Sequence, residues 1–341
     1  MSLRIFVLLL LVAALAYPQA IYQGGSDYGW FNCPNTYYNN VVNWDLTAAQ
    51  TQIKSQLASM YANGQRVLRV WLWYMDGGDN CTTTEPLGTR NFYVNSTGGN
   101  LSAQCMSNLT GYLAAVKAAG FTGATFVFGP GGENLAQNWP TDWSTNQSYS
   151  AKYWGLLNEA WELIENVQPV ALAAGLGVKI DLYNEGIPPA NLSAYSGWVL
   201  YDQILWGWYK DAYGTANTVG YSFVGGTAAA ANMLPVIYDI PYEPNQEYPP
   251  VFDIHLYPPT GQSQSYYGTT WTTLKSLGLT QGWIIGEAFY QDSDEASGLA
   301  AAQKEYGNTV YMLEQWPILR SNQGECLVPP YSFTTYMSYG W

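Results

Sequence analysis

Short β-rich runs alternate with longer helical patterns along nearly the whole chain, and this alternation constrains the fold more than any other feature. Runs rich in Val, Ile, Trp and Tyr predict strands over 20–30, 66–74, 122–129, 178–186, 218–226, 250–258, 282–290 and 308–317. Between them, apolar residues near a 3.6-residue period predict helices over 45–64, 107–120, about 149–167, 196–213, part of 228–239, 269–278 and 294–307.

Eight strand-and-helix units in 341 residues predict an α/β fold, a single-domain (β/α)8 TIM barrel. A doubly wound open sheet is the alternative. No GxGxxG motif follows the first predicted strand to support a nucleotide-binding fold.

The N-terminus, MSLRIFVLLLLVAALAYPQA, has one Arg and then an apolar run from Ile5 to Ala16. This run is too short to span a bilayer comfortably, and it ends in Ala-Leu-Ala, the small-x-small pattern of a signal-peptidase site. We therefore expect a signal peptide over residues 1–16, with cleavage after residue 16 or 20, and one (β/α)8 domain over 17–341. The mature protein is expected to be secreted and extracellular, without membrane contact. A retained anchor is the alternative.

Charged residues are scarce and aromatic residues are abundant. Lys, Arg, Asp and Glu make up 11 % of residues, against about 25 % in a typical soluble domain. The net charge is −13, and the 12 Lys and Arg residues are spread too thinly for a basic patch, which argues against a nucleic-acid partner. The 15 Trp and 29 Tyr residues suit a neutral, ring-shaped ligand and suit a large apolar core equally well.

Four cysteines predict two disulfides in an exported protein. Of the three pairings we expect Cys81–Cys105, which closes one loop, and Cys33–Cys326, which ties the two ends of the domain. The chain has no CxxC motif and a single histidine, so we expect no metal site and no cofactor. Asn-x-Ser/Thr sequons, which allow glycosylation, occur at Asn80, Asn95, Asn108, Asn146 and Asn191.

Alternation along the predicted strands places polar and aromatic side chains on one face and apolar side chains on the other. In a barrel the apolar face packs on helices, and the other face lines the interior. The expected inward residues include Arg69, Trp71, Trp73, Asp181, Glu185, Asp253, His255, Tyr257, Trp283, Ile285, Glu287, Glu314 and Trp316. Asn184 falls on the face toward the helices. The polar residues concentrate near the carboxyl ends of the strands, where the active sites of such barrels lie.

Glu185 and Glu287 come at the ends of two strands that lie nearly opposite each other in an eight-strand ring. Glycoside hydrolysis needs such a pair, because one carboxyl protonates the leaving oxygen while the other attacks the sugar carbon or activates water.

The other acidic residues have plainer interpretations. We expect Asp181 and Asp253 to form core ion pairs with Lys179 or Arg69. Glu159 belongs to a helical pattern and is expected to be solvated, whereas Glu133 follows a strand and is a candidate binding residue near the mouth.

The ordered set of motifs resembles the retaining β-glycosidases of glycoside hydrolase clan A, and family 5 in particular. LYNEG matches the Asn-Glu pair that carries the acid/base at the end of the fourth strand, and IIGEAF matches the nucleophile at the end of the seventh. LRVWLWY, DIHLYP and EQWP supply the Arg, His-x-Tyr and Trp of that family as Arg69, His255, Tyr257 and Trp316. Two positions depart from the pattern: Gly186 stands where family 5 usually has Pro, and FGPGGEN lacks the His that many family 5 cellulases have after the third strand.

The resemblance implies double displacement, with Glu287 as the nucleophile and Glu185 as the acid/base. Arg69 and Tyr257 would hold Glu287 ionised, His255 would orient its neighbours, Asn184 would bond the sugar 2-OH, and Trp316 would lie under the reacting sugar. The substrate that it implies is a β-1,4-linked polysaccharide or oligosaccharide. Candidate subsite residues are Trp71, Trp73, Trp139, Trp143, Trp283 and Glu133.

An endo-β-glucanase (cellulase) is the preferred activity, with an endo-β-mannanase or an exo-acting β-glycosidase as alternatives. A non-catalytic glycan-binding cell-surface protein is the alternative from another class, and the presence of both carboxylates argues against it. We expect a monomer.

Overall fold

The computed structural model describes residues 23–28, 39–82, 90–189, 192–240, 246–321 and 329–341. Within these ranges, every paired strand belongs to one parallel sheet. Its strands are β1 (Gln23–Asp27), β2 (Val67–Met75), β3 (Val94–Asn95), β4 (Gly123–Pro130), β5 (Gly177–Asp181), β6 (Thr218–Gly220), β7 (Phe223–Val224), β8 (Val251–His255), β9 (Gly282–Phe289) and β10 (Val310–Trp316).

The sheet runs in the order β6-β5-β4-β2-β1-β10-β9-β8-β7, with β3 paired to β2. Strand β10 therefore pairs with β1, the first strand of the chain. The two strands at the ends of this order, β6 and β7, are separated in the chain by only Tyr221 and Ser222. The result is a curled parallel α/β sheet, as the alternation of strands and helices predicts.

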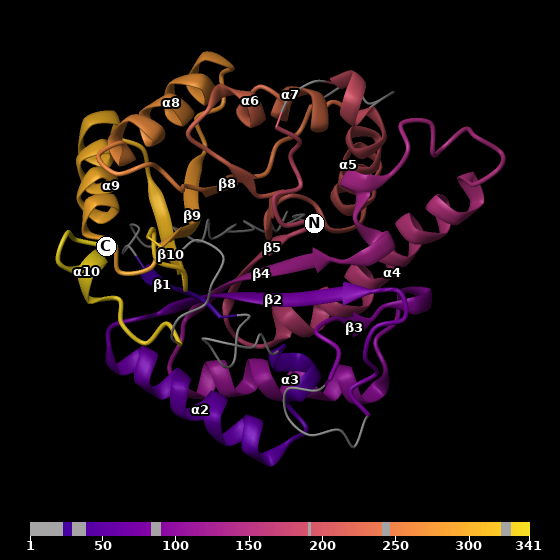
Figure 1. Ribbon diagram of the computed structural model, residues 1–341, viewed down its shortest axis with the longest axis horizontal. Coiled ribbons are helices and arrows are strands. Elements are labelled where there is room, and N and C mark those ends of the chain that lie inside the picture. The colour runs from indigo at the N-terminus through magenta and orange to yellow at the C-terminus, as the bar shows by residue number, and fades with distance from the viewer. Residues whose placement is uncertain (1–22, 29–38, 83–89, 190–191, 241–245, 322–328) are drawn as a thin grey trace, which may run out of the picture.

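Helices lie around the outside of this sheet (Figure 1). They are α1 (Asn40–Asn43), α2 (Thr47–Ala62), α3 (Ala103–Ala118), α4 (Ser150–Ala173), α5 (Leu192–Tyr213), α6 (Ala228–Ala231), α7 (Leu234–Ile237), α8 (Ser263–Ser276), α9 (Ser293–Tyr306) and α10 (Thr334–Met337), with 3-10 turns at Thr97–Gly99, Gly132–Asn134 and Ala136–Asn138. Local signals set some of these bounds. The Asp292 side chain accepts a hydrogen bond from Glu295 N at the start of α9, and Gly307 ends the helix in the left-handed conformation.

Strand β2 shows how the sequence pattern positions the site. Leu68, Val70 and Leu72 are fully buried in the main core, which includes the inner faces of the helices. Because successive strand residues point to opposite faces, Arg69 and Trp71 face the interior of the curled sheet. Strand β2 thus brings a cation and an aromatic ring to the same face.

The fourth predicted strand is shorter than its sequence suggests. Strand β5 ends at Asp181, and a turn follows in which Gly186 N donates to Tyr183 O. Glu185 in this turn has a φ of 51°. The alternation that places Asn184 toward the helices is therefore wrong, because the strand geometry stops three residues before it.

Strand β9 contains an extra residue near its carboxyl end. Ile254 pairs with Ile285 and His255 pairs with Glu287, so Gly286 has no counterpart on β8. Trp283 and Ile285 consequently pack in the core on the helix side, while Glu287 points into the interior. The expectation that Trp283 and Ile285 share a face with Glu287 is wrong, because this bulge changes the facing of the strand. A Cβ at position 286 would lie 2.1 Å from Asp253 Oδ1, so glycine is required there.

The disulfide Cys81–Cys105 is confirmed. The Cys33–Cys326 pairing and the predicted signal peptide lie outside the described residues. Among the helices of the described ranges, none combines the length and the apolar character that crossing a membrane requires.

Candidate active site

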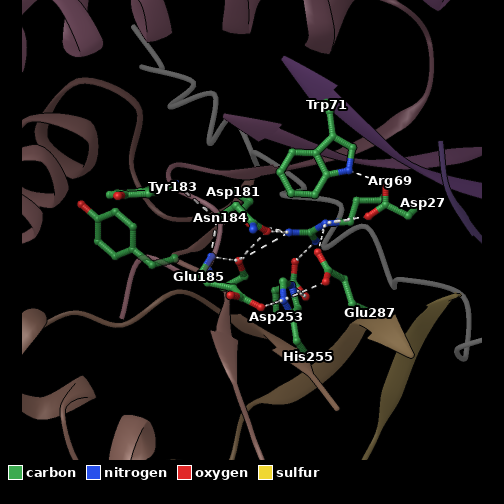
Figure 2. A network of polar contacts seen from close by, with 12 residues as sticks. Asp27, Arg69, Trp71, Asp181, Tyr183, Asn184, Glu185, Asp253, His255 and Glu287 are labelled. Carbon is green, nitrogen blue, oxygen red and sulfur yellow. Dashed lines mark hydrogen bonds and ion pairs between the residues drawn. The ribbon is translucent and has the colours of Figure 1, made fainter. Parts of the chain in front are cut away.

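Arg69 lies at the centre of the polar interior (Figure 2). Its guanidinium is fully buried and forms ion pairs with Asp181 at 2.8 Å and with Asp253. It also lies 3.6 Å from an oxygen of Asp27 and 3.7 Å from an oxygen of Glu287. The expected core ion pairs of Asp181 and Asp253 with Arg69 are therefore present, whereas Lys179 Nζ donates to a backbone carbonyl instead.

The turn after β5 brings Asn184 and Glu185 to this cluster. Arg69 donates to Asn184 Oδ1 at 2.8 Å, and Ser222 Oγ accepts from the backbone N of Glu185 at 2.8 Å. The side chain of Glu185 is 39 % exposed, so it reaches the solvent-facing mouth while its backbone is held inside. Figure 2 shows Asn184 and Glu185 side by side at this edge.

His255 connects the two glutamates. Its Nδ1 lies 2.9 Å from Glu185 Oε1 and 3.4 Å from Glu287 Oε2. Tyr257 follows on the same segment, and its hydroxyl donates to Glu287 Oε2. The nearest polar atoms of Glu185, His255 and Glu287 all lie within 4.8 Å of one another. This group could also hold a metal ion, but such an ion would replace the hydrogen bond between His255 and Glu185.

Burial and the neighbouring charges have opposing effects on the pKa values of Glu185, His255 and Glu287. Burial raises the pKa of Glu287, although His255 and Arg69 oppose the rise. Burial acts in the same way on Glu185, but the hydrogen bond and charge of His255 outweigh it, and the net pKa of Glu185 is lowered. Burial disfavours the charged form of His255, yet Glu287 and Glu185 raise its pKa overall. His255 thus binds a proton more readily because it lies against both carboxylates.

Three tryptophans form an aromatic wall beside the glutamates. The rings of Trp71 and Trp73 are stacked at 4.1 Å with an interplanar angle of 2°. Trp316 meets Trp71 edge to face at 6.0 Å. Trp71 is nearly buried and donates through Nε1 to Asp27, whereas Trp73 and Trp316 are partly exposed. These positions agree with the inward facing that the sequence predicts for all three.

Two cavities lie at this site. The smaller cavity, of about 390 Å³, is lined by Trp71, Trp73, Asn184, Glu185, Tyr257, Glu287, Phe289, Trp316 and Ile318. The larger cavity, of about 620 Å³, is lined by residues that include Trp73, Gln137, Asn138, Asn184, Glu185, Tyr195 and Trp198. Because Trp73, Asn184 and Glu185 line both, the two cavities meet at Glu185.

Three of the candidate subsite tryptophans do not reach these cavities. Trp143 and Trp283 are fully buried, and Trp139 is 7 % exposed. Trp283 packs against Tyr267 and Trp271 on α8, and Trp143 donates through Nε1 to Gly197 O. The expectation that these rings form sugar platforms is corrected, because the apolar core uses them instead.

Glu133 and Glu159 also differ from what the sequence predicts. Glu133 is exposed and forms an ion pair with Lys152 at 2.6 Å, and it lines neither cavity. Glu159 is buried rather than solvated, and it accepts hydrogen bonds from Ser96 Oγ and Asn134 Nδ2. A helical pattern alone gives no sign of the loop that covers Glu159.

Sequence reasoning missed Asp27 and Ser222. Asp27 ends β1 and accepts a hydrogen bond from Trp71 Nε1, so its place at the carboxyl end of a strand was a usable signal. Ser222 lies between β6 and β7, and its side-chain hydroxyl supports Glu185 by accepting a hydrogen bond from the backbone N of that residue. No spacing in the sequence marks such a contact.

No protein-family model matches this chain. No curated protein matches it either. Solved structures do match. A broad-specificity endoglucanase of glycoside hydrolase family 5 (GH5-4) from Clostridium longisporum has a TM-score of 0.55 and 10 % identity, over 94 % of each chain. A GH5_18 protein from Bifidobacterium longum subsp. infantis has a TM-score of 0.52 and 8 % identity, over 94 % of this chain and 79 % of that one.

A third match is a GH5_18 protein from Bifidobacterium longum subsp. longum in complex with Manb1-4GlcNAc. It has a TM-score of 0.52 and 9 % identity, over 94 % of this chain and 78 % of that one. This chain therefore shares its fold with solved structures of glycoside hydrolase family 5, in agreement with the resemblance of its motifs. At such low identity the likeness shows the fold, and the activity has to be argued from the site.

Proposed function

We propose that this protein is a retaining glycoside hydrolase that cleaves β-1,4-linked polysaccharide, acting as an endo-β-glucanase. One observation carries the proposal: carboxylate oxygens of Glu185 and Glu287 lie within 4.8 Å of each other where two cavities meet. Retaining enzymes hold their two carboxyl groups about 5–5.5 Å apart, and inverting enzymes about 6.5–9.5 Å apart. The close approach leaves no room for an intervening water and favours direct attack by a carboxylate.

Glu287 is the nucleophile in this proposal. Tyr257 donates to one of its oxygens, and Arg69 lies 3.7 Å from the other. Both contacts stabilise the anion against the desolvation that burial imposes. Its attack on the anomeric carbon forms a glycosyl-enzyme ester while Glu185 protonates the departing oxygen. Glu185 then takes a proton from water, whose oxygen displaces Glu287.

Glu185 needs a proton for its role as acid, although its pKa is lowered in the free protein. A substrate that fills both cavities covers the exposed part of this side chain. Covering a carboxylate removes water that stabilises its charge and raises its pKa. Substrate binding thus favours the protonated form of Glu185 at the step where protonation is required.

The same proposal includes barrel closure, secretion and endo action. The neighbour order of the strands, the β1–β10 pairing and the two-residue step between β6 and β7 support closure as a (β/α)8 barrel, with β6 and β7 as one interrupted strand. The apolar N-terminal run supports secretion, which gives the enzyme access to a polymer outside the cell. A cavity on each side of Glu185 supports endo action rather than exo action, because a polymer can extend in both directions.

The first test is release of reducing sugar from cellulose, mixed-linkage glucan, mannan and xylan at pH 3–7. We expect release by the wild-type protein, with the largest rate on a β-glucan, and loss of release in Glu287→Gln. Glu165→Gln, which changes an exposed glutamate on the outer surface of α4, is the matched control and should keep the wild-type rate. Highest activity on mannan would instead select the mannanase alternative, and no release from any glycan would overturn the proposal.

Azide rescue separates the two roles. Azide can enter the space left in Glu185→Ala, attack the glycosyl-enzyme and give a β-glycosyl azide. In Glu287→Ala it can replace the nucleophile and give an α-glycosyl azide. The reverse pattern would exchange the assigned roles, so the anomeric configuration of the product, measured by NMR, decides between them.

A further inference from the structure

Arg320 forms an ion-pair cluster that lies outside both cavities. It follows β10 in the chain, and its side chain is 14 % exposed. Its guanidinium binds the carboxylate of Asp292 at two points, Nε to Oδ2 at 2.7 Å and Nη2 to Oδ1 at 2.9 Å. Two-point pairing between these planar groups fixes the direction of the arginine side chain as well as its distance.

The same guanidinium contacts the surroundings of Tyr257. Its Nη1 donates to Pro258 O, the carbonyl of the next residue in the chain. Its central carbon lies 4.8 Å from the ring centroid of Phe289, which is buried. The ring of Phe289 in turn lies 5.1 Å from the ring of Tyr257. Arg320 therefore holds both the main chain that follows Tyr257 and the ring beside it.

Tyr257 depends on such contacts because it lies beyond His255, the last residue of β8. Leu256 N still donates to Glu287 O at 2.9 Å, but within the described ranges no strand pairing includes Tyr257. Its side chain is partly exposed, and its hydroxyl donates to Glu287 Oε2. A side chain on unpaired backbone keeps a precise hydrogen bond only where neighbouring contacts fix its ring and its main chain.

We propose that Arg320 is a positioning residue for Glu287, the proposed nucleophile. It holds Pro258 and Phe289 in place, and these two residues keep the hydroxyl of Tyr257 on the Glu287 carboxylate. This inference rests on the proposed function. A shift of about 1 Å in a reacting group can lower a rate by roughly 100-fold. Contacts that lie outside the cavities can therefore set the rate of the reaction.

Loss of this support should change the pH profile. Burial raises the pKa of Glu287, and the hydrogen bond from Tyr257 is one of the contacts that oppose the rise. A displaced Tyr257 therefore raises this pKa further. Because the nucleophile must be ionised, the acidic limb of kcat/KM then moves to higher pH. The charged and titratable groups that face Glu287 are Asp27, Arg69, Glu185, His255 and Tyr257.

The test measures kcat and KM at pH 3–7 on the glycan from which the wild-type protein releases reducing sugar fastest. Arg320→Met should lower kcat by roughly 10- to 100-fold, with a smaller change in KM, and should move the acidic limb to higher pH. Arg320→Lys keeps the charge without the two-point pairing, so it should shift both in the same direction by less, and it gives the reading if Arg320→Met does not fold. The matched control is Arg66→Met, since Arg66 also packs on an aromatic ring, that of Tyr61 at 4.0 Å, but next to the amino end of β2. It should keep the wild-type profile.

Two further variants separate positioning from charge. Asp292→Asn weakens the hold on Arg320 but keeps a side-chain oxygen to cap α9. Loss of a negative charge alone would move the acidic limb to lower pH, whereas loss of positioning moves it to higher pH. Adding Arg320→Met to Tyr257→Phe should cause no further shift, because both changes remove the same hydrogen bond.

Three results would each overturn the inference alone: a wild-type profile in Arg320→Met, a shift to lower pH in Asp292→Asn, or additive shifts in the double variant. Absence of release from every glycan by the wild-type protein would overturn the proposed function, and this inference with it.

Discussion

Glu314 provides a test of the electrostatics of the interior. This residue lies on β10, and its side chain is fully buried. Burial raises its pKa from the ordinary 4.5 to about 8, and Asp253 adds to the rise, while Arg69 and Thr125 oppose it. Replacing Glu314 with Gln keeps the size of the side chain and removes its titration. The exchange therefore isolates the cost of ionising a buried carboxyl.

The direction and size of the effect follow from proton linkage. Below pH 4.5 the carboxyl is protonated in both the folded and the unfolded protein, so Glu and Gln should give similar stability. As pH rises toward 8, the unfolded state releases this proton while the folded state keeps it, and the folded protein loses stability. Each pH unit in this window contributes about 1.4 kcal/mol. At pH 7 the Gln variant should therefore be more stable than the wild-type protein by about 3 kcal/mol.

Urea unfolding at pH 4, 5.5, 7 and 8 measures the difference. The free energy of unfolding of Glu314→Gln minus that of the wild-type protein should be near zero at pH 4 and should grow steadily to pH 8. Glu165→Gln, at an exposed position on α4, should show almost no such slope. The reasoning would be refuted if this difference in unfolding free energy were the same at all four pH values. It would also be refuted if the wild-type protein became more stable relative to the variant as pH rises.

Three further predictions concern other parts of the site and fold. Arg69→Met leaves several buried carboxylates without their cation and should lower the free energy of unfolding by about 3–5 kcal/mol. Urea titration at pH 7 measures this loss of stability. A loss no larger than that caused by substituting an exposed residue would contradict the prediction. Replacing both Cys81 and Cys105 with Ser removes a link across a sequence separation of 24, and the same titration should show a loss of about 3 kcal/mol, whereas unchanged stability contradicts the entropic argument. His255→Gln removes a charge that lowers the pKa values of Glu185 and Glu287, the proposed catalytic carboxyls. Both limbs of the pH profile of kcat/KM should therefore move to higher pH, and a shift to lower pH would contradict the role of His255.

Much of the fold could be predicted from local patterns. The expected strand over 66–74 is β2 (Val67–Met75), and the expected helix over 294–307 is α9 (Ser293–Tyr306). In each case the spacing of the apolar residues and the residues that end the element indicate the same structure. Local preference and tertiary packing therefore favour the same structure. The predicted helix over about 149–167 continues to Ala173 in α4, past Pro169, because packing overrides the local break.

The site was predictable where residues lie on regular strands and less so where the strands become irregular. Arg69 and His255 face the interior as alternation predicts. Asn184 does not follow the pattern, because β5 ends at Asp181. Trp283 fails for a related reason, since the bulge at Gly286 changes the face of β9 before Glu287.

By itself the sequence determined the order of strands and helices, the scarcity of charge and the chemical identity of the paired glutamates. These properties depend on residue type and on periods of two or 3.6 residues, which are local. Only the tertiary structure decided which tryptophans face a cavity, that Glu159 is buried, and that His255 lies between Glu185 and Glu287. The physical reason is that burial and close contact depend on segments far apart in the chain. One extra residue in β9 is enough to redirect the side chain of Glu287.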